Sequence, residues 1–188
     1  MRRNGMRTVA ATAVVAASLS LVSVAIPATA NAAAPEFQLP FPCGQTWRGD
    51  NDNSSAHRSY EIDFNRGPEA DSDLGDKVVA AAKGTVRSAS HQGSANGFGN
   101  LVKIEHSGGY FTYYAHLKTI SVTVGQSVTR GQKIGTLGNT SKPGNNITPH
   151  LHYEVRLGSS GYPGNIQKAT FNGSRFDYPE ATITSRNC

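Results

Sequence analysis

The sequence predicts an all-β fold, a β-sandwich or a β-barrel. Three observations lead to this class. Beyond Cys43 the chain shows almost no helical periodicity, it consists of short runs of alternating apolar and polar residues, and Gly, Asn, Ser and Pro separate these runs. Many short strands divided by tight turns are typical of sandwiches and barrels.

The alternating runs define seven candidate strands. Gly108-Gly109 separates two of them and predicts a tight hairpin. The stretches Ser90–Phe98 and Gly138–Pro149 are long for simple turns, and long loops on a β scaffold often carry function. The predicted strands are Tyr60–Phe64, Lys77–Ala81, Gly84–Ser88, Leu101–His106, Tyr110–His116, Gln132–Leu137 and Leu151–Leu157.

Residues 1–32 are predicted to be a secretory signal peptide. Three arginines within the first seven residues precede an uncharged, apolar or small stretch from Thr8 to Pro27, and small-x-small sites follow at 28–30 and 30–32. A membrane anchor is the rival interpretation, because the stretch approaches spanning length. Its Ser, Thr and Ala content and the cleavage sites favour a cleaved signal. We therefore expect a secreted, extracellular protein without a membrane attachment after cleavage.

Residues 33–188 have the length of one domain, and we expect a monomer. Of the 18 basic residues three lie in the predicted signal and none of the 13 acidic residues does, so the remainder carries a net charge of +2. A mildly cationic surface suits an anionic wall polymer. No run of basic residues is interleaved with aromatic ones, so the sequence does not indicate nucleic-acid binding.

Cys43 and Cys188 are the only cysteines. In an exported protein such a pair is expected to form a disulfide, with two free thiols as the alternative. Neither lies in a Cys-x-x-Cys pair, which argues against a zinc role. Between the signal and Cys43, the segment Ala33–Pro42 is expected to be an exposed lead-in, because its prolines disfavour regular structure.

The histidines carry the most chemical information. His150 and His152 lie two apart in a predicted strand, so they share one face while Leu151, Tyr153 and Val155 face the core. Two imidazoles on one face can share a metal ion, or one can bind the metal while the other acts on its water. Taken alone, the pair is equally compatible with surface or structural histidines.

A carboxylate and two further histidines complete the candidate set. Asp63 alternates with core residues in a predicted strand, where a carboxylate is costly unless it is paired or metal-bound. His57 follows a polar stretch, and His116 ends an aromatic-rich strand. Two histidines and one carboxylate are a common catalytic zinc set. In isolation, His57 would be interpreted as a polar loop residue and His116 as a packed strand-end residue.

Together these motifs resemble the lysostaphin-type, LytM-like family of zinc endopeptidases. That family has a His…Asp motif, an aromatic-Ala-His-Leu motif and a closing His-x-His motif, in this order. The resemblance is dense from about Arg58 to Leu157. It extends to the segments between the motifs, namely Gly75–Val86, Gly97–Ile104, Val124–Val128, Arg130–Gly135 and Gly138–Thr140.

The resemblance implies a single lysostaphin-type metallopeptidase domain over residues 33–188. Its core would be an antiparallel β-sandwich or barrel-like structure, with an active-site groove between long loops. The resemblance also implies a peptidoglycan hydrolase that holds one Zn²⁺ per chain and cleaves peptide bonds in stems or cross-bridges of the wall. The zinc ligands would be His57, Asp63 and His152, and His116 and His150 would be the catalytic histidines. One of these two would accept the proton of the attacking water, and the sequence does not distinguish them.

The spacing of the first motif departs from the family. His57 and Asp63 are separated by five residues where three are common, and Glu61 stands at the usual distance from His57. The Ile-Asp-Phe context favours Asp63. His91 and His106 are expected to be solvated, and Tyr113 or Tyr114 would either line the groove or pack.

Two other functions are compatible with the resemblance. Some family members have lost zinc ligands and regulate other wall hydrolases, whereas here every ligand and both catalytic histidines are present. A pure wall-binding module would need no His-x-His pair.

Overall fold

The computed structural model of the protein describes residues 1, 33–52 and 57–188. The predicted signal segment, apart from Met1, lies outside these residues. Among the described residues, no helix has the length and apolar character that crossing a membrane requires.

The elements are β1 (Thr46–Asp50), β2 (Ile62–Asn65), β3 (Lys77–Val79), β4 (Gly84–His91), β5 (Asn100–Glu105), the 3₁₀ turn η1 (Ser107–Gly109), β6 (Tyr110–Ala115), β7 (Thr119–Ile120), β8 (Ser127–Val128), β9 (Lys133–Thr136), β10 (Leu151–Leu157), β11 (Ile166–Gln167), β12 (Thr170–Phe171), β13 (Ser174–Arg175) and β14 (Glu180–Thr184).

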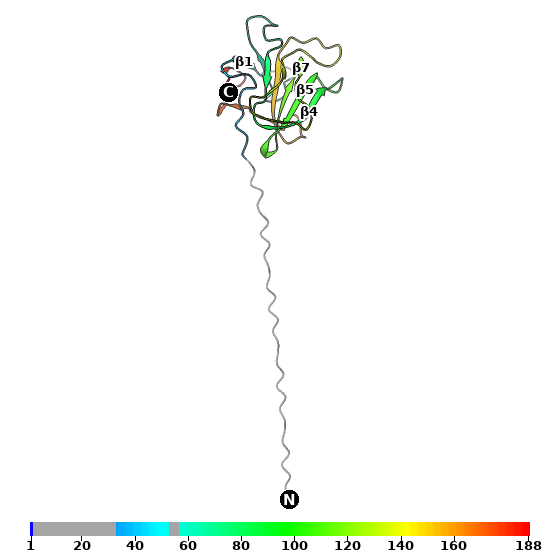
Figure 1. The fold of residues 1–188 in the computed structure, drawn as a ribbon, viewed down its shortest axis with the longest axis vertical. Coiled ribbons are helices and arrows are strands. Elements are labelled where there is room, and N and C mark those ends of the chain that lie inside the picture. Colours follow the sequence, from blue (N-terminus) through cyan, green and yellow to red (C-terminus); the bar gives the residue numbers. More distant parts are fainter. Residues whose placement is uncertain (2–32, 53–56) are drawn as a thin grey trace. The chain divides into compact units, whose positions relative to one another are not determined.

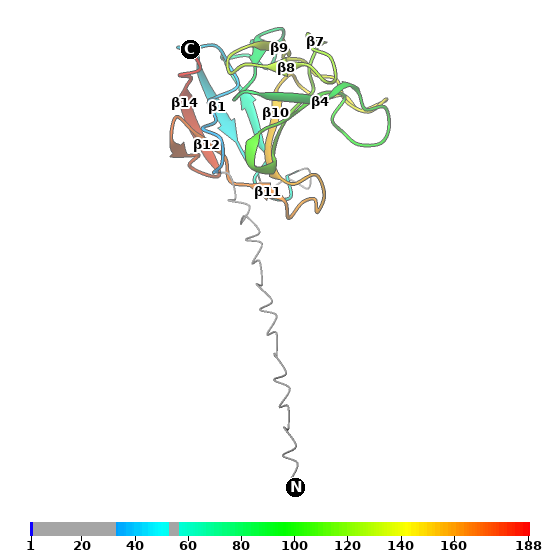
Figure 2. The same ribbon diagram turned by 60° about the horizontal axis from the view of Figure 1, so that its bottom comes forward.

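The main sheet has the order β14-β1-β2-β10-β6-β5-β4-β8, with β11 paired to β10 at one end (Figures 1 and 2). All of its strand pairs are antiparallel. A three-stranded sheet, β3-β9-β7, and the hairpin β12-β13 complete the fold. The prediction of an all-β antiparallel fold is therefore confirmed. β10 lies inside the main sheet, between β2 and β6, and this position brings three sequence motifs side by side.

The two larger sheets share one hydrophobic core. Val78 and Ile134 from the three-stranded sheet belong to the same buried cluster as Phe64, Tyr153 and Trp47 from the main sheet. As the alternating pattern predicts, Leu151, Tyr153 and Val155 of β10 lie in this core. Burial of such apolar side chains is the main driving force for folding, so the core fixes which face each strand presents to solvent.

The expectation of an exposed lead-in before Cys43 is wrong. Phe37, Leu39 and Phe41 are buried, and the Phe41 ring stacks on Trp47 at a centroid distance of 3.5 Å. The segment forms no regular element, as its prolines suggest, but it still hydrogen-bonds to the rest of the fold. Gln38 N donates to Ala81 O, and Val79 N donates to Pro40 O, both at 2.9 Å. The apolar residues between the prolines therefore determine its burial.

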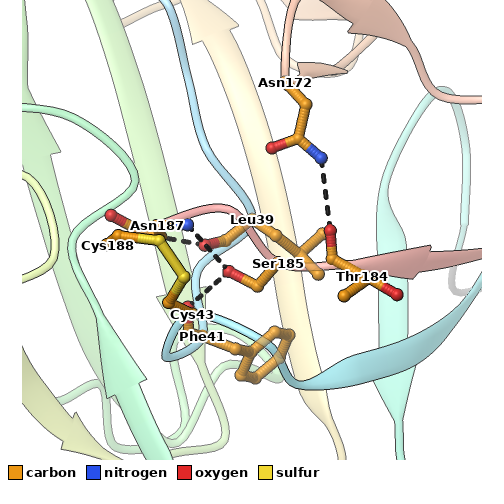
Figure 3. The surroundings of a disulfide bond; sticks show 8 residues. All are labelled: Leu39, Phe41, Cys43, Asn172, Thr184, Ser185, Asn187 and Cys188. Atoms are coloured by element: carbon orange, nitrogen blue, oxygen red, sulfur yellow. Dashed lines mark hydrogen bonds between the residues drawn. A yellow bond between two sulfur atoms is a disulfide. The ribbon is translucent and has the colours of Figure 1, made fainter.

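The predicted disulfide between Cys43 and Cys188 is confirmed (Figure 3). It closes a separation of 145 residues, with the two Cα atoms 4.8 Å apart. Hydrogen bonds beside it connect the same two ends of the domain. Ser185 Oγ donates to Phe41 O at 2.7 Å, and Asn187 Nδ2 donates to Leu39 O at 3.0 Å.

Two predictions about single side chains are also wrong. His106, expected to be solvated, is buried, and its ring nitrogens lie 2.8 Å from Lys83 O and 2.7 Å from Thr112 Oγ1. The strand predicted to begin at Tyr60 begins at Ile62, so Tyr60 precedes β2 and its side chain is exposed. His91 is exposed, as expected.

Candidate metal centre

β2 and β10 place Asp63 and His152 directly opposite each other. Asp63 Oδ1 lies 2.9 Å from His152 Nδ1. His57, in the loop before β2, reaches the other carboxylate oxygen, with its Nε2 3.1 Å from Asp63 Oδ2. One potential ligand atom from each of these three residues lies within 4.8 Å of the others. The structure thus brings together the three residues that the family resemblance implies as metal ligands.

The electrostatics of the three residues reflect this contact. Burial would raise the pKa of Asp63, but hydrogen bonds from His152 and His57 lower it far below its usual range. Burial would lower the pKa of His152, but hydrogen bonds to Asp63 and Glu154 raise it to about 10. The carboxylates beside both ring nitrogens therefore favour the imidazolium form of His152. Binding a cation at these nitrogens requires the release of protons.

His116 and His150 lie beside this cluster. Their ring centroids are 4.6 Å apart, and His150 Nε2 lies 3.5 Å from Asp63 Oδ2. His116 Nδ1 is 2.8 Å from Thr140 O, and His150 Nδ1 is 2.8 Å from Thr148 O. Because a carbonyl oxygen only accepts, both Nδ1 atoms carry the proton, which leaves each Nε2 as the proton-accepting nitrogen of the neutral ring.

His116 is buried and has an unusual backbone conformation. Burial lowers the pKa of His116 to about 3, with the neighbouring charges of His150 and His152 adding to the effect. The residue also has a left-handed backbone with φ of 59°. Strained conformations of this kind cluster at functional sites, where the surrounding structure holds them in place.

A groove of about 720 Å³ runs over these residues. Both long loops identified in the sequence contribute to its walls, one through Phe98 and the other through Ser141 and Lys142. The residues that line the groove are His57, Arg58, Asp63, Asn96, Gly97, Phe98, His116, Ser141, Lys142, Asn145, Ile147, His150, His152, Arg156 and Tyr162.

Glu61, which has the usual family spacing from His57, lies outside the cluster. It is fully buried and accepts hydrogen bonds from the backbone nitrogens of Arg58 and Ser59, at 3.3 and 2.7 Å. It therefore fixes the turn that follows His57. Tyr113 and Tyr114 are both buried, and neither lines the groove.

The sequence analysis missed two charged residues next to His152. His152 Nε2 lies 2.9 Å from Glu154 Oε1, and Arg156 Nε donates to the other oxygen of Glu154. Both charged side chains are buried, with 1% and 7% of their surface exposed. The strand alternation that pairs His150 with His152 could have found them, because it places residues 154 and 156 on the same face.

Comparisons with known proteins place these features in a family. A model described as "Peptidase family M23" matches residues 63–165, a range that includes Asp63, His116, His150 and His152 but not His57. The peptidoglycan DD-endopeptidase ShyA of Vibrio cholerae is 35% identical over 134 residues, 69% of this chain and 29% of ShyA. The murein hydrolase activator NlpD of Salmonella typhimurium is 39% identical over 92 residues, 49% of this chain and 23% of NlpD.

Another relative is the uncharacterized lipoprotein YgeR of Escherichia coli, 39% identical over 92 residues, 49% of this chain and 34% of YgeR. The chain thus spans about a third or less of these curated relatives. Among solved structures, the antimicrobial peptidase lysostaphin from Staphylococcus simulans superposes with a TM-score of 0.53 at 26% identity, covering 72% of this chain and 51% of lysostaphin. The family model covers more than half of the chain, and the protein therefore belongs to peptidase family M23.

Proposed function

We propose that this protein is a zinc-dependent endopeptidase that hydrolyses peptide bonds in the stems or cross-bridges of bacterial peptidoglycan. The observation that carries the proposal is the meeting of His57, Asp63 and His152 within 4.8 Å, in a groove that also holds His116 and His150. Two imidazoles and one carboxylate are a common catalytic zinc set, and three protein ligands leave a fourth position for water or substrate.

The donor chemistry of the cluster fits Zn²⁺, with one ion per chain. Imidazole nitrogen and carboxylate oxygen are both ordinary zinc ligands, and no cysteine lines the groove among the described residues. A zinc ion held there would supply Lewis acidity, which polarises a scissile carbonyl and brings the pKa of a bound water from about 15.7 to roughly 7.

His116 and His150 would carry the protons of the reaction. Each donates Nδ1–H to a backbone carbonyl, which holds the ring and directs the chemistry to Nε2. One of the two accepts the proton of the attacking water. The other, when it also carries a proton on Nε2, donates a hydrogen bond to the developing oxyanion or that proton to the leaving amine. Groups of this kind typically contribute about 10²–10⁴-fold to the rate.

A peptide bond, and not a glycosidic bond, is the proposed target. Glycoside hydrolases typically need two carboxyl groups flanking the bond. Asp63 supplies the one carboxylate among the described residues of the groove, and two histidines already engage it. The similarity to ShyA, named as a peptidoglycan DD-endopeptidase, supports the same substrate class.

The proposed setting is the cell wall outside the cytoplasmic membrane. Residues 1–32 would act as a signal peptide that is removed after export, and residues 33–188 would work as one monomeric domain. The disulfide between Cys43 and Cys188 supports export, because such bonds persist in oxidising compartments.

A non-catalytic regulator is the competing function, since NlpD is named as a murein hydrolase activator. Zinc content and wall digestion with the purified protein separate the two. We expect one zinc per chain, clearing of a purified wall suspension and release of new free amino groups. A folded protein that carries no zinc and clears no wall would be a regulator. Release of new reducing sugar ends alone would show that the bond is glycosidic.

A further inference from the structure

One face of β10 carries a row of charged groups that ends at the candidate metal centre. His152, Glu154 and Arg156 alternate along the strand, so their side chains share a face. Arg156 donates to one oxygen of Glu154, and the other oxygen lies 2.9 Å from His152 Nε2. On the opposite side of the ring, His152 Nδ1 lies 2.9 Å from Asp63 Oδ1. The two nitrogens of His152 thus face different carboxylates with different surroundings.

We propose that Glu154 is a positioning residue that holds Nε2–H of His152 and so makes Nδ1 the metal-binding atom. The inference rests on the proposed zinc site. An ionised carboxylate can only accept hydrogen bonds, so a Glu154 carboxylate requires the proton on Nε2. Nδ1, beside Asp63, is then the nitrogen that gives up its proton to a cation. A carboxylate that acts on the outer nitrogen of a metal-binding imidazole fixes its tautomer and raises its basicity as a ligand.

Arg156 makes the buried position of Glu154 tolerable. A carboxylate with 1% of its surface exposed is costly unless a charge and hydrogen bonds compensate it. The Arg156 guanidinium provides both, and it also lies over two aromatic rings. Its central carbon lies 4.1 Å from the ring centroid of Tyr113 and 4.7 Å from that of Tyr162. Stacking on aromatic faces is a favourable environment for a guanidinium.

The main sheet and Phe98 together hold the side chains around this row in place. Tyr113 on β6 is the register partner of Glu154, so the main sheet fixes the ring against which Arg156 packs. Phe98 covers the other end of the row, with its ring centroid 5.6 Å from that of His152 and 6.1 Å from that of Tyr113. Turning the His152 ring to offer Nε2 to the metal would give up its contacts with both Asp63 and Glu154.

The primary test is imidazole NMR on the zinc-loaded protein with ¹⁵N-labelled histidine. Two-bond proton–nitrogen correlations show which nitrogen of each ring bears hydrogen. We expect His152 to be protonated at Nε2 and metal-bound at Nδ1. Metal bound at Nε2 would overturn the inference while leaving the zinc site in place. A protein that takes up no zinc would overturn the proposed function and this inference with it.

The second test is the zinc dissociation constant of Glu154→Gln, measured by chelator competition at pH 7. Loss of the carboxylate charge should weaken zinc binding about 10–100-fold, the range observed for such outer partners. The matched control is Glu105→Gln, which removes the carboxylate of the Arg87–Glu105 ion pair outside the groove. It should bind zinc like the unsubstituted protein. A folded Glu154→Gln protein with unchanged zinc affinity would overturn the inference, and the NMR test still decides it if this variant does not fold.

Discussion

The two regions that supply imidazoles to the candidate metal centre use the same arrangement in different surroundings. In each, one ring nitrogen faces Asp63 and the other faces a second carboxylate. For His57, in an irregular loop, the second carboxylate is Asp52, whose oxygen lies 3.0 Å from Nδ1 and whose side chain is 61% exposed. For His152, in the middle of the main sheet, it is Glu154, which is 1% exposed. Solvent screens the first contact and not the second.

The two regions also differ in how their backbone is held. β10 has a hydrogen-bonded strand on each side, and this pairing fixes the backbone from which His152 and Glu154 project. The described residues of the loop around His57, 51–52 and 57–61, pair in no such ladder. Glu61 holds the part that follows His57 through two backbone nitrogens. We therefore expect substitutions on β10 to reduce zinc affinity and stability more than the equivalent substitutions around His57 do.

The largest expected effect comes from removing a ligand. His152→Ala and His57→Ala should both lose zinc and wall-clearing activity, because each reduces three protein ligands to two. His152→Ala also deprives buried Glu154 of a hydrogen bond. It should therefore lower the unfolding free energy of the metal-free protein by about 1–3 kcal/mol, and His57→Ala should lower it less. Elemental analysis after dialysis and urea unfolding measure the two effects. One retained zinc per chain in His152→Ala would contradict the ligand assignment.

The next effect separates ligands from their neighbours. His116→Ala and His150→Ala should each keep close to one zinc per chain, since neither residue belongs to the three-residue cluster. Their hydrolysis rates should fall about 10²–10⁴-fold, the usual contribution of a general acid or base. Zinc content measured beside the rate of amino-group release tests this. The assignment would be reversed if His150→Ala were metal-free while His152→Ala retained its zinc.

A smaller effect should appear in the pH dependence of stability, and His106 provides the reference. Burial lowers the pKa of this histidine below 6.5, with a backbone hydrogen bond and a nearby charge opposing the shift only in part. Its neutral form is the stabilising one, so its contribution is complete above pH 6.5 and is lost as the pH falls. For His152 the shift runs in the opposite direction, because the pKa in the folded protein is raised to about 10. Its contribution is present below pH 6.5 and is lost as the pH rises through 10.

Urea unfolding of the metal-free protein between pH 5 and pH 10 measures both contributions. The acid-side loss of stability should be smaller in His106→Gln, and the alkaline-side loss should be smaller in His152→Ala. Identical pH profiles for these variants and the unsubstituted protein would show that burial and the carboxylates do not distinguish the two histidines.

The smallest effect should come from the exposed carboxylate. Asp52→Asn should change zinc affinity by less than about fivefold, because exposed ion pairs are worth up to about 1 kcal/mol. Chelator competition under the conditions used for Glu154→Gln gives the comparison directly. Equal losses in the two variants would mean that solvent exposure does not determine the strength of the outer contact.

The sequence could predict features that depend on local alternation, but not the pairing of strands that are distant in sequence. Strict alternation in Leu151–Leu157 predicts both bounds of β10 and its core face, because side chains in a strand repeat with period two. β1 and β14 were not predicted, although they form one edge of the main sheet. β1 and β14 pair with each other although most of the chain separates them in sequence. The alternation within one short strand carries no information about so distant a partner.

The candidate site shows the same limit. His57, Asp63, His116, His150 and His152 could all be identified from motifs, but their mutual distances depend on the register between β2, β10 and β6. The contact between Glu154 and Arg156 was missed because each residue alone resembles an ordinary charged strand residue. Burial of His106 was missed because its partners, Lys83 and Thr112, come from other segments.

The buried segment before Cys43 sets how far the N-terminus of the proposed secreted form can be trimmed. Ala33 to Glu36 are the last residues before the ring of Phe37 enters the core. From Gln38 onward the backbone is hydrogen-bonded to Ala81 and Val79. An aminopeptidase in the surroundings of the cell should therefore remove a few residues and then stop near Phe37. The final N-terminus would then be defined by packing, and not by which of the two predicted small-x-small sites is cleaved.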